Sequence, residues 1–306
     1  MKKSPIILDC TLRDGSYLNN YNFSPNITLS YLKKIQHIKV NYCEIGHGLG
    51  IGAYRNKSCR SKVSDQKLID KLKYLKKKKT KIGFFAQPKF LNDFDLELIK
   101  NSEIDFLRIG VIPENYKMIE NVVQKLKNKK IEIFAFFMQS FRDRPKSLQK
   151  KITQLNKNLG LKNFYIVDST GSMNFDEIKQ YFESIKLVND NFKVGFHGHN
   201  NMGIANYNSF RCIEEGFDFV DGTFMGVGRG AGNSCYEHLI LNYKKKLKLN
   251  NNDILSLLKF SNYFQKMIKI ETPSNSHNTL CGILKIHEQN KVDFAKIKSM
   301  LNDKTF

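Results

Sequence analysis

The chain alternates between short apolar runs, rich in β-branched and aromatic residues, and longer stretches whose apolar positions recur at helical spacing. The short runs predict eight strands, at residues 5–10, 40–46, 81–86, 104–109, 131–138, 163–168, 193–198 and 218–221. The stretches between them predict amphipathic helices at about 26–38, 65–77, 92–100, 114–128, 146–158, 175–187, 203–215 and 234–246. Such alternation is typical of βαβ units around a parallel sheet.

The number of these units predicts an α/β protein with a (β/α)8 TIM-barrel fold. Eight strand–helix pairs over about 245 residues match the usual barrel size of roughly 250 residues. An open doubly wound sheet would normally carry a glycine-rich turn after its first strand, and DCTLRDG (9–15) offers none. After about residue 247 the pattern becomes helical, at 252–269 and 278–300, with the loop 271–278 between. We therefore expect a barrel domain over 1–247 and a small C-terminal helical extension over 248–306.

Composition favours a folded cytoplasmic protein. With 306 residues, 41% of them hydrophobic, the chain can bury a large core. The start of the chain, MKKSPIILDC, lacks the apolar stretch of a secretory signal, and no run reaches the roughly 18 to 20 apolar residues of a membrane span. The six cysteines, at positions 10, 43, 59, 212, 235 and 281, form no CxxC pair, which indicates reduced thiols. We expect no membrane association.

A formal net charge of +21 raises the question of nucleic-acid binding, because clustered Lys and Arg are the footprint of phosphate recognition. The lysines are instead spread over nearly every position where a solvated helix face needs a polar residue, as in 71–81 and 243–251. This distribution favours a solvated surface over a nucleic-acid interface. Such a surface would still attract anionic metabolites.

Polar residues gather where the predicted strands end, which in this fold is where active sites form. Thr11, Arg13 and Asp14 follow the first strand, Glu44 and His47 the second, Asp168 and Ser169 the sixth, His197 and His199 the seventh, and Asp221 the eighth.

The pair His197 and His199 predicts a metal site. Side chains alternate along a strand, so both imidazoles point the same way, and two neutral imidazoles at that spacing can share one cation. Asp14, at another strand end, would complete three ligands and leave positions open for a bidentate substrate. The alternative is that loop carbonyls satisfy both histidines.

Two further features suggest anion binding near this site. Arg13 precedes Asp14, and an Arg-Asp dipeptide could be a surface charge or a salt bridge. At the end of a first strand an oxyanion clamp is the better interpretation, because the planar, permanently charged guanidinium suits a carboxylate or a developing enolate. GVGRGAGN (226–233) could cradle an anion on its backbone N–H groups or could be a tight turn into the last helix. It does not match a Walker A pattern. Asn233 could cap that helix or approach the metal.

Five segments together resemble a known family: LDCTLRDG (8–15), CEIGHG (43–48), VDSTG (167–171), GFHGHNNMGIAN (195–206) and DGTFMGVGRGAGN (221–233). Their order is similar to that of the pyruvate carboxyltransferase-like, or HMGL-like, DRE-TIM metallolyase superfamily. Within it the chain looks most like the 4-hydroxy-2-oxovalerate aldolases. The resemblance covers about residues 1–245, and the pair LRDG and HGHN is its most specific part.

The resemblance implies a lyase in which Asp14, His197 and His199, with Asn233 as a further candidate, bind a divalent metal. Manganese is the expected ion, with magnesium, zinc or cobalt as alternatives. The ion would hold an α-keto acid such as pyruvate. Arg13 would stabilise the enolate oxygen, and Ser169, together with Glu44, would bind substrate.

One departure concerns proton transfer. The aldolases carry a histidine three residues after the metal-binding aspartate, and this chain has Tyr17 there. A phenol with an ordinary pKa near 10 is a poorer base at neutral pH than an imidazole. His47, Tyr17 and His277 are the candidates for the proton-transfer group, and Arg13, Tyr17 and His47 are the candidate catalytic residues.

Three functions remain open at this point. The first is a metal-dependent aldolase acting on a 4-hydroxy-2-oxo acid, with pyruvate and an aldehyde as partners. The second is a Claisen-type acyltransferase, which would release free CoA from an acyl-CoA. The third is a degenerate barrel that only binds. We expect a homodimer, and we do not carry over the acylating dehydrogenase that the aldolases bind.

Overall fold

The computed structural model describes residues 4–75, 79–127, 129–245, 247–268 and 272. Eight parallel strands close into a barrel in chain order: β1 (Ile6–Asp9), β2 (Tyr42–Ile45), β3 (Lys81–Ala86), β4 (Phe106–Val111), β5 (Glu132–Phe137), β6 (Asn163–Asp168), β7 (Lys193–Gly198) and β8 (Phe219–Gly222). The predicted (β/α)8 TIM barrel is therefore confirmed, and each strand begins within two residues of its predicted first residue.

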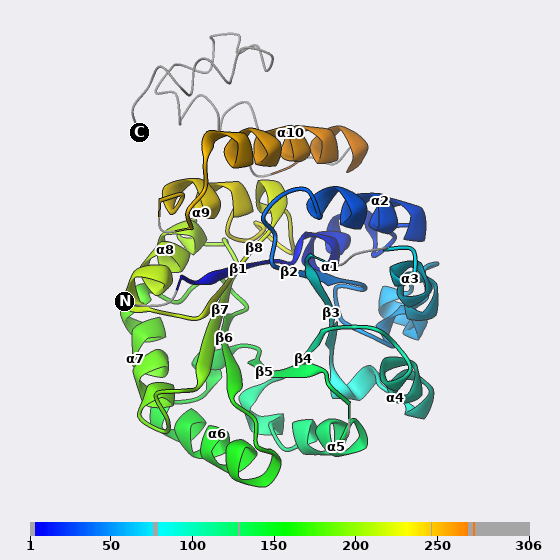
Figure 1. Ribbon diagram of the computed structural model, residues 1–306. Coiled ribbons are helices and arrows are strands. Elements are labelled where there is room, and N and C mark those ends of the chain that lie inside the picture. The colour runs from blue at the N-terminus through cyan, green and yellow to red at the C-terminus, as the bar shows by residue number, and fades with distance from the viewer. Residues whose placement is uncertain (1–3, 76–78, 128, 246, 269–271, 273–306) are drawn as a thin grey trace.

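A ring of helices covers the outside of the barrel (Figure 1). These are α2 (Pro25–Ile35), α3 (Asp65–Leu72), α4 (Asp93–Lys100), α5 (Met118–Lys125), α6 (Pro145–Leu159), α7 (Phe175–Lys186), α8 (Ala205–Glu215) and α9 (Tyr236–Asn242). Local signals fix several helix ends. Asn92 and Asn174 each form a reciprocal capping box, and Gly160, with φ +69°, ends α6 in the left-handed conformation.

The alternation of side chains along each strand separates two cores. Outward-facing residues such as Ile7, Leu107 and Ile166 pack against the helices. Inward-facing aromatic residues, among them Tyr42, Phe106, Phe134, Tyr165 and Phe219, fill the barrel. Gly83 and Gly195 make room for them, because a Cβ at either position would collide with the ring of Phe106 or Tyr165. The polar site described below lies inside the same barrel.

The chain after residue 247 continues the helical layer. Helix α10 (Asn251–Ile268) lies outside α2 and α9 and corresponds to the predicted helix 252–269 (Figure 1). Its Phe260 and Phe264 meet Tyr31 of α2 edge to face, with ring centroids 5.1 and 4.9 Å apart. The predicted second helix, 278–300, lies outside the described residues, and the domain boundary at 247 stays a prediction.

The first strand ends one residue earlier than predicted, and a helical turn that the sequence pattern did not predict follows it. β1 stops at Asp9, and Thr11–Asp14 form one turn of helix, α1, followed by the 3-10 helix η1 (Gly15–Asn19). The cause is local, since Asp9 Oδ1 accepts hydrogen bonds from the Thr11 N–H (2.9 Å) and the Thr11 hydroxyl (2.5 Å). This turn carries Arg13 and Asp14 over the mouth of the barrel.

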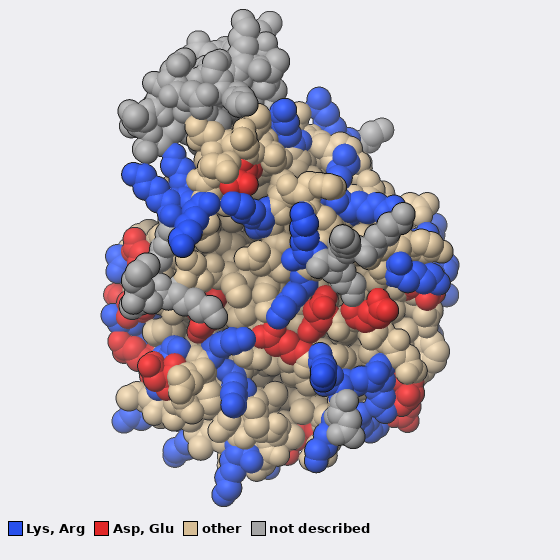
Figure 2. All heavy atoms as spheres, viewed as in Figure 1, with Lys and Arg blue, Asp and Glu red and all other residues tan. Residues whose placement is uncertain are grey.

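On the face drawn in Figure 2, Lys and Arg side chains are distributed widely, with Asp and Glu between them. This matches the expectation that the lysines occupy solvated positions. None of the helices in the described part of the chain is long and apolar enough to span a bilayer.

Candidate metal centre

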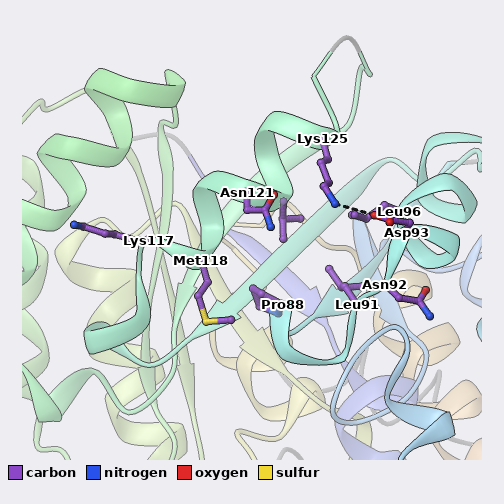
Figure 3. A pocket seen from close by; sticks show the side chains of 10 residues that line it. Pro88, Leu91, Asn92, Asp93, Leu96, Lys117, Met118, Asn121 and Lys125 are labelled. Atoms are coloured by element: carbon purple, nitrogen blue, oxygen red, sulfur yellow. Dashed lines mark hydrogen bonds and ion pairs between the residues drawn. The ribbon is translucent and has the colours of Figure 1, made fainter.

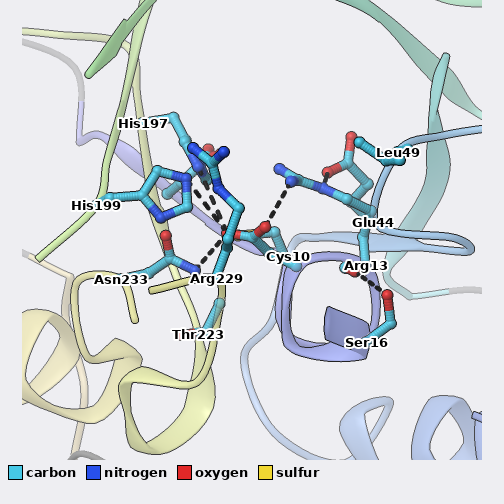
Figure 4. Close-up of polar contacts among 12 residues, drawn as sticks. Cys10, Arg13, Ser16, Glu44, Leu49, His197, His199, Thr223, Arg229 and Asn233 are labelled. Atoms are coloured by element: carbon cyan, nitrogen blue, oxygen red, sulfur yellow. Dashed lines mark hydrogen bonds and ion pairs between the residues drawn. The ribbon is translucent and has the colours of Figure 1, made fainter. Parts of the chain in front are cut away.

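The structure brings together the three residues predicted to bind a metal. Asp14 comes from α1, whereas His197 and His199 lie on and just after β7. Asp14 Oδ2 is 3.6 Å from His197 Nε2 and 3.9 Å from His199 Nε2, and all three side chains are buried. One ligand atom from each residue lies within 4.8 Å of the others (Figure 4). One carboxylate and two imidazoles are donors that suit a divalent transition metal.

A neighbouring carboxylate orients His197. Its Nδ1 is 2.8 Å from Asp221 Oδ2, so the proton of a neutral ring lies on Nδ1 and the lone pair of Nε2 faces Asp14. A carboxylate behind a histidine in this way fixes the tautomer of a metal ligand and raises its basicity.

Two buried polar atoms at this cluster make no hydrogen bond to the described residues: His199 Nδ1 and Asn233 Oδ1. Unpaired buried polar atoms are costly, and a cation would offset that cost. Burial, with smaller contributions from neighbouring groups, lowers the pKa of His199 to about 4, which keeps the ring neutral, as a ligand must be. The residues present therefore fit a divalent ion.

Asn233 lies beside the carboxylate of Asp14. Its Nδ2 donates to Asp14 Oδ2 (2.5 Å) and to the Val227 carbonyl (3.0 Å). It does not cap the following helix, α9, because the N-cap residue of that helix is Cys235. Asn233 therefore lies beside a predicted metal ligand, and its role toward a metal stays a prediction.

Arg13 also contacts Asp14. Its Nη1 donates to Asp14 Oδ1 (3.0 Å), and its Nε donates to Glu44 Oε2 (2.6 Å). Burial opposes ionisation of Asp14, but the charge of Arg13, aided by the two histidines and the Asn233 amide, holds the pKa of Asp14 well below its usual value. The remaining nitrogen, Arg13 Nη2, is buried without a hydrogen-bond partner among the described residues. One strong donor is thus available for an anionic ligand.

A chain of ion pairs connects Arg13 to the metal cluster through Arg108 of β4. Glu44 accepts from both Arg13 and Arg108, and Arg108 in turn donates to Asp221, which holds His197. The guanidinium of Arg108 is fully buried and lies over the rings of Phe136 and Tyr165. Glu44, predicted to bind substrate, has both of its oxygens occupied by guanidinium groups. It therefore orients Arg13.

Sequence reasoning overlooked Arg108. The run FLRIGV was interpreted only as a strand, yet an arginine at an inward position of a buried strand is itself a signal, because charged residues are almost never fully buried unless they are paired.

Cys10, His197 and Asp221 form a second group with metal-binding side chains. Burial, reinforced by the charge of Asp221, raises the pKa of the Cys10 thiol well above its usual value, and its Sγ donates to the Gly222 carbonyl at 3.6 Å. The Asp221 carboxylate is already paired with Arg108 and His197. The cluster around Asp14 is the better candidate.

Tyr17, Tyr21 and His47 form an aromatic edge to the site. The ring of Tyr21 stacks on His47 at 4.0 Å and meets Tyr17 edge to face at 5.1 Å. Gly48 makes room for Tyr17, because a Cβ there would lie 2.6 Å from its ring. Burial, reinforced by the charge of Asp14, raises the pKa of Tyr17 above its usual value, so this phenol stays protonated.

His47 has both ring nitrogens occupied. Nδ1 accepts from the Leu49 N–H (3.1 Å), which places the ring proton on Nε2, and Nε2 lies 2.8 Å from the Cys59 carbonyl. Such an imidazole holds the loop after β2 and has no free lone pair for a base. The third candidate, His277, lies outside the described residues.

Ser169 and the glycine-rich loop lie at the mouth. Ser169 Oγ accepts from the Gln139 N–H (3.0 Å), which leaves its hydroxyl hydrogen free to donate. In the loop 226–233, the N–H groups of Gly226, Gly232 and Asn233 bond to carbonyls of the β8–α9 connection. This favours the tight turn over an anion cradle. Asp168 instead caps the turn after β6, accepting from two backbone N–H groups.

A groove of about 380 Å³ lies between α4 and α5 on the outer layer (Figure 3). The ion pair between Lys125 and Asp93 crosses it at 2.8 Å. None of the residues that line it belongs to the metal cluster.

Comparisons with known proteins agree with this geometry. The model of the HMGL-like family matches residues 110–264. An oxaloacetate decarboxylase of Mycobacterium tuberculosis is 30% identical over 78% of this chain and 69% of its own length. A 4-hydroxy-2-oxovalerate aldolase of Carboxydothermus hydrogenoformans is 30% identical over 78% of this chain and 70% of its own.

Among solved structures, a hydroxymethylglutaryl-CoA lyase from Pseudomonas aeruginosa superimposes with a TM-score of 0.72. It covers 92% of this chain and 99% of its own, but at 12% identity it shows the fold alone. The matching family model and the relatives at 30% identity confirm the predicted family and the predicted class of enzyme. The chain belongs to the HMGL-like family and is an enzyme of the lyase class.

Proposed function

We propose that this enzyme is a divalent-metal-dependent aldolase that cleaves or forms the C3–C4 bond of a 4-hydroxy-2-oxo acid through the enolate of pyruvate. Several relatives are named 4-hydroxy-2-oxovalerate aldolase, at 27 to 30% identity. Loss of carbon dioxide from oxaloacetate, the substrate in the name of another relative, also leaves pyruvate enolate. The reactions in the names of both kinds of relative can thus pass through the same intermediate, pyruvate enolate.

The observation that carries the proposal is the cluster of Asp14, His197 and His199 beside Arg13. We assign these three as the metal ligands, with Asn233 Oδ1 as a fourth candidate. Manganese is the proposed ion, since a mixed carboxylate and imidazole set suits it. When bound, such an ion polarises the ketone and neutralises developing negative charge.

Arg13 is proposed to bind the enolate oxygen. In cleavage, the C3–C4 bond breaks, its electron pair passes to the enolate, and the 4-hydroxyl gives its proton to solvent as C4 becomes an aldehyde. The negative charge that develops needs a fixed donor already in place. Arg13 Nη2 has that character, because Glu44 and Asp14 hold the other side of the guanidinium.

Tyr17 is proposed to donate the proton that C3 of the enolate takes up to give pyruvate. Burial keeps this phenol in its protonated form, so it holds a proton that the enolate can take up. Ser169 is proposed to donate its free hydroxyl hydrogen to the carboxylate of the 2-oxo acid. His47 is assigned to loop positioning. The homodimer stays a prediction.

Exchange of solvent deuterium into the methyl group of pyruvate tests this function. We expect exchange by the wild-type enzyme with Mn²⁺, and a loss of about 10²-fold or more in His197→Ala and in Asp14→Ala, because enolisation depends on the cluster. His37→Ala, an exposed histidine on the outer layer, is the matched control and should exchange normally. Exchange that neither substitution reduces would contradict the assigned site.

A further inference from the structure

Neither the metal cluster nor its network of ion pairs uses Arg229, in the loop between β8 and α9. This residue is exposed, and its Nη2 donates to the Ser169 carbonyl at 2.6 Å. Within the described ranges it pairs with no carboxylate, whereas Arg13, Arg108 and Arg142 each do. It is therefore a cation at the mouth with no carboxylate partner in the described part of the chain.

The backbone of Arg229 is fixed by its neighbours. A Cβ at Gly228 would collide with the Asn233 amide, and one at Gly230, where φ is +62°, would lie 2.7 Å from Asn201 Oδ1. The Arg229 carbonyl accepts from the Gly232 N–H at 3.1 Å. Both flanking positions thus need glycine, and the guanidinium projects from a rigid base.

The charge of Arg229 reaches both sides of the site. On one side, its guanidinium is anchored at the end of β6, where Nη2 meets the Ser169 carbonyl. Its charge also favours ionisation of Tyr17 and Tyr21, although burial dominates both groups. Figure 4 shows Arg229 among the side chains that line the site together with His199 and Asn233. The guanidinium is thus within electrostatic range of the metal ligands and of the tyrosine edge.

The charges of the site indicate which kind of ligand would neutralise Arg229. The buried network holds three carboxylates, Asp14, Glu44 and Asp221, and two guanidinium groups, Arg13 and Arg108. Its net charge is one negative, which a divalent ion would turn into one positive. The single carboxylate of a simple 2-oxo acid balances that charge. Arg229 then leaves one positive charge that a second anionic group would neutralise.

We propose that Arg229 binds a second carboxylate of the substrate, so that the preferred substrates are 4-hydroxy-2-oxo diacids. The inference rests on the proposed aldolase function and names its substrate class. Cleavage of such a diacid between C3 and C4 gives pyruvate and an aldehyde that carries a carboxylate. The electron pair of the broken bond stays with the pyruvate fragment, and the 4-hydroxyl proton is released.

Two substrates that differ in one group test the proposal. 4-Hydroxy-2-oxoglutarate and 4-hydroxy-2-oxovalerate carry a carboxylate and a methyl group, respectively, on C4, and both release pyruvate. We expect kcat/KM to be roughly 10- to 100-fold higher for the diacid, the range of a charge-assisted hydrogen bond. In Arg229→Gln that ratio should fall to about one, and Arg229→Lys should keep part of it.

Arg142→Gln is the matched control. Arg142 follows another strand, β5, and is already paired with Glu114 at 2.8 Å. Its loss should leave the ratio unchanged. Because the readout is a ratio within one protein, general damage to the fold cancels. A second readout needs no variant: 2-oxoglutarate should inhibit pyruvate exchange by the wild-type enzyme more strongly than 2-oxovalerate, which has the same length and one carboxylate.

The outcomes separate the two proposals. A ratio near one or favouring the monoacid, or a ratio that Arg229→Gln does not change, overturns the role of Arg229. Pyruvate could exchange deuterium while neither hydroxy acid is cleaved, and the inhibition readout then decides. Equal inhibition by the two oxo acids overturns the role of Arg229, whereas stronger inhibition by 2-oxoglutarate supports that role. Absence of exchange in the wild-type enzyme overturns the aldolase function itself, and this inference with it.

Discussion

Two parts of the barrel interior are equally buried but differ in chemistry. The charged layer consists of Arg13, Asp14, Glu44, Arg108 and Asp221, each at most 4% exposed. The aromatic floor consists of Tyr42, Phe106, Phe134, Tyr165 and Phe219, each at most 6% exposed. In the floor, Phe134 meets Phe219 edge to face at 5.1 Å, and Tyr42 meets Phe219 at 5.2 Å.

The difference shows two ways to fill one barrel. Aromatic rings contribute through the area they remove from water and through favourable ring geometry, so each residue contributes largely independently. Charges in the same environment are stable only when every group has its partner, because removing one leaves another charge buried and unpaired. The floor therefore supports the fold, whereas the charged layer ties stability to the site.

The largest expected effect follows from Arg108→Met, which removes the cation between Glu44 and Asp221. We expect a loss of about 3–5 kcal/mol in the free energy of unfolding, because two buried carboxylates lose a partner. Urea denaturation measures this loss, and calorimetric titration with Mn²⁺ should show affinity reduced by roughly 10- to 100-fold.

Phe134→Leu in the aromatic floor is the comparison for that variant. It should cost about 1–3 kcal/mol through lost packing, with metal affinity unchanged. If Arg108→Met is as stable as wild type and binds Mn²⁺ as tightly, the contrast between the two regions fails.

A smaller effect is expected for Asp9, a buried carboxylate that faces α2 and has hydrogen-bond donors but no cation. Burial raises its pKa to about 6, despite bonds from Thr11 and from the Tyr31 hydroxyl (2.7 Å). The folded state then binds the proton more tightly than the unfolded chain, so this group's contribution to stability is full below about pH 4 and is lost as pH rises through 6.

That loss corresponds to roughly 3 kcal/mol. Asp9→Asn should remove it, so the difference in unfolding free energy between variant and wild type should grow in favour of the variant from pH 4 to pH 7 and then level off. Urea titrations at four pH values measure the difference. A constant difference across that range would show that Asp9 titrates as an ordinary carboxyl.

The smallest effect on metal affinity is expected for Asp221→Asn, although this variant also removes an anionic partner of Arg108. The amide oxygen can still accept from His197 Nδ1, but the charge that raises the basicity of the imidazole is lost. We expect Mn²⁺ affinity to fall by roughly 10-fold, measured by the same titration. Asp218→Asn, before the same strand, is the control, since Asp218 accepts from the Val194 N–H instead. Equal Mn²⁺ affinities in the two variants would show that the charge of Asp221 does not contribute to metal binding.

Much of the fold and part of the site could be predicted from the sequence. The period of strands and helices is local, because β-branched runs and amphipathic stretches fix their own conformation, and this gave eight strands in the right order. The HxH spacing on a strand is local too, so His197 and His199 were found together. Asp14 was proposed because it follows another predicted strand, where the active-site residues of this fold gather.

The differences came where a conformation or a role depends on hydrogen bonds that residue types alone do not specify. Thr11–Asp14 turn into a helix because Asp9 caps that turn, and a short polar stretch does not reveal this. His47 was a candidate base until the structure placed Cys59 and Leu49 on its two nitrogens. Arg229 was hidden within a glycine-rich segment that was interpreted through its glycines.

The sequence by itself determined the barrel and most of the chemically active side chains, since strand period and residue type are properties of short segments. Only the tertiary structure decided which of these side chains form ion pairs and hydrogen bonds with one another. Glu44 lies 64 residues from Arg108, and Asp221 lies 113 residues from it, yet closure of the barrel makes them one ion-paired layer. That pairing leaves Arg13 Nη2 without a partner among the described residues, because charge balance is a property of the assembled site.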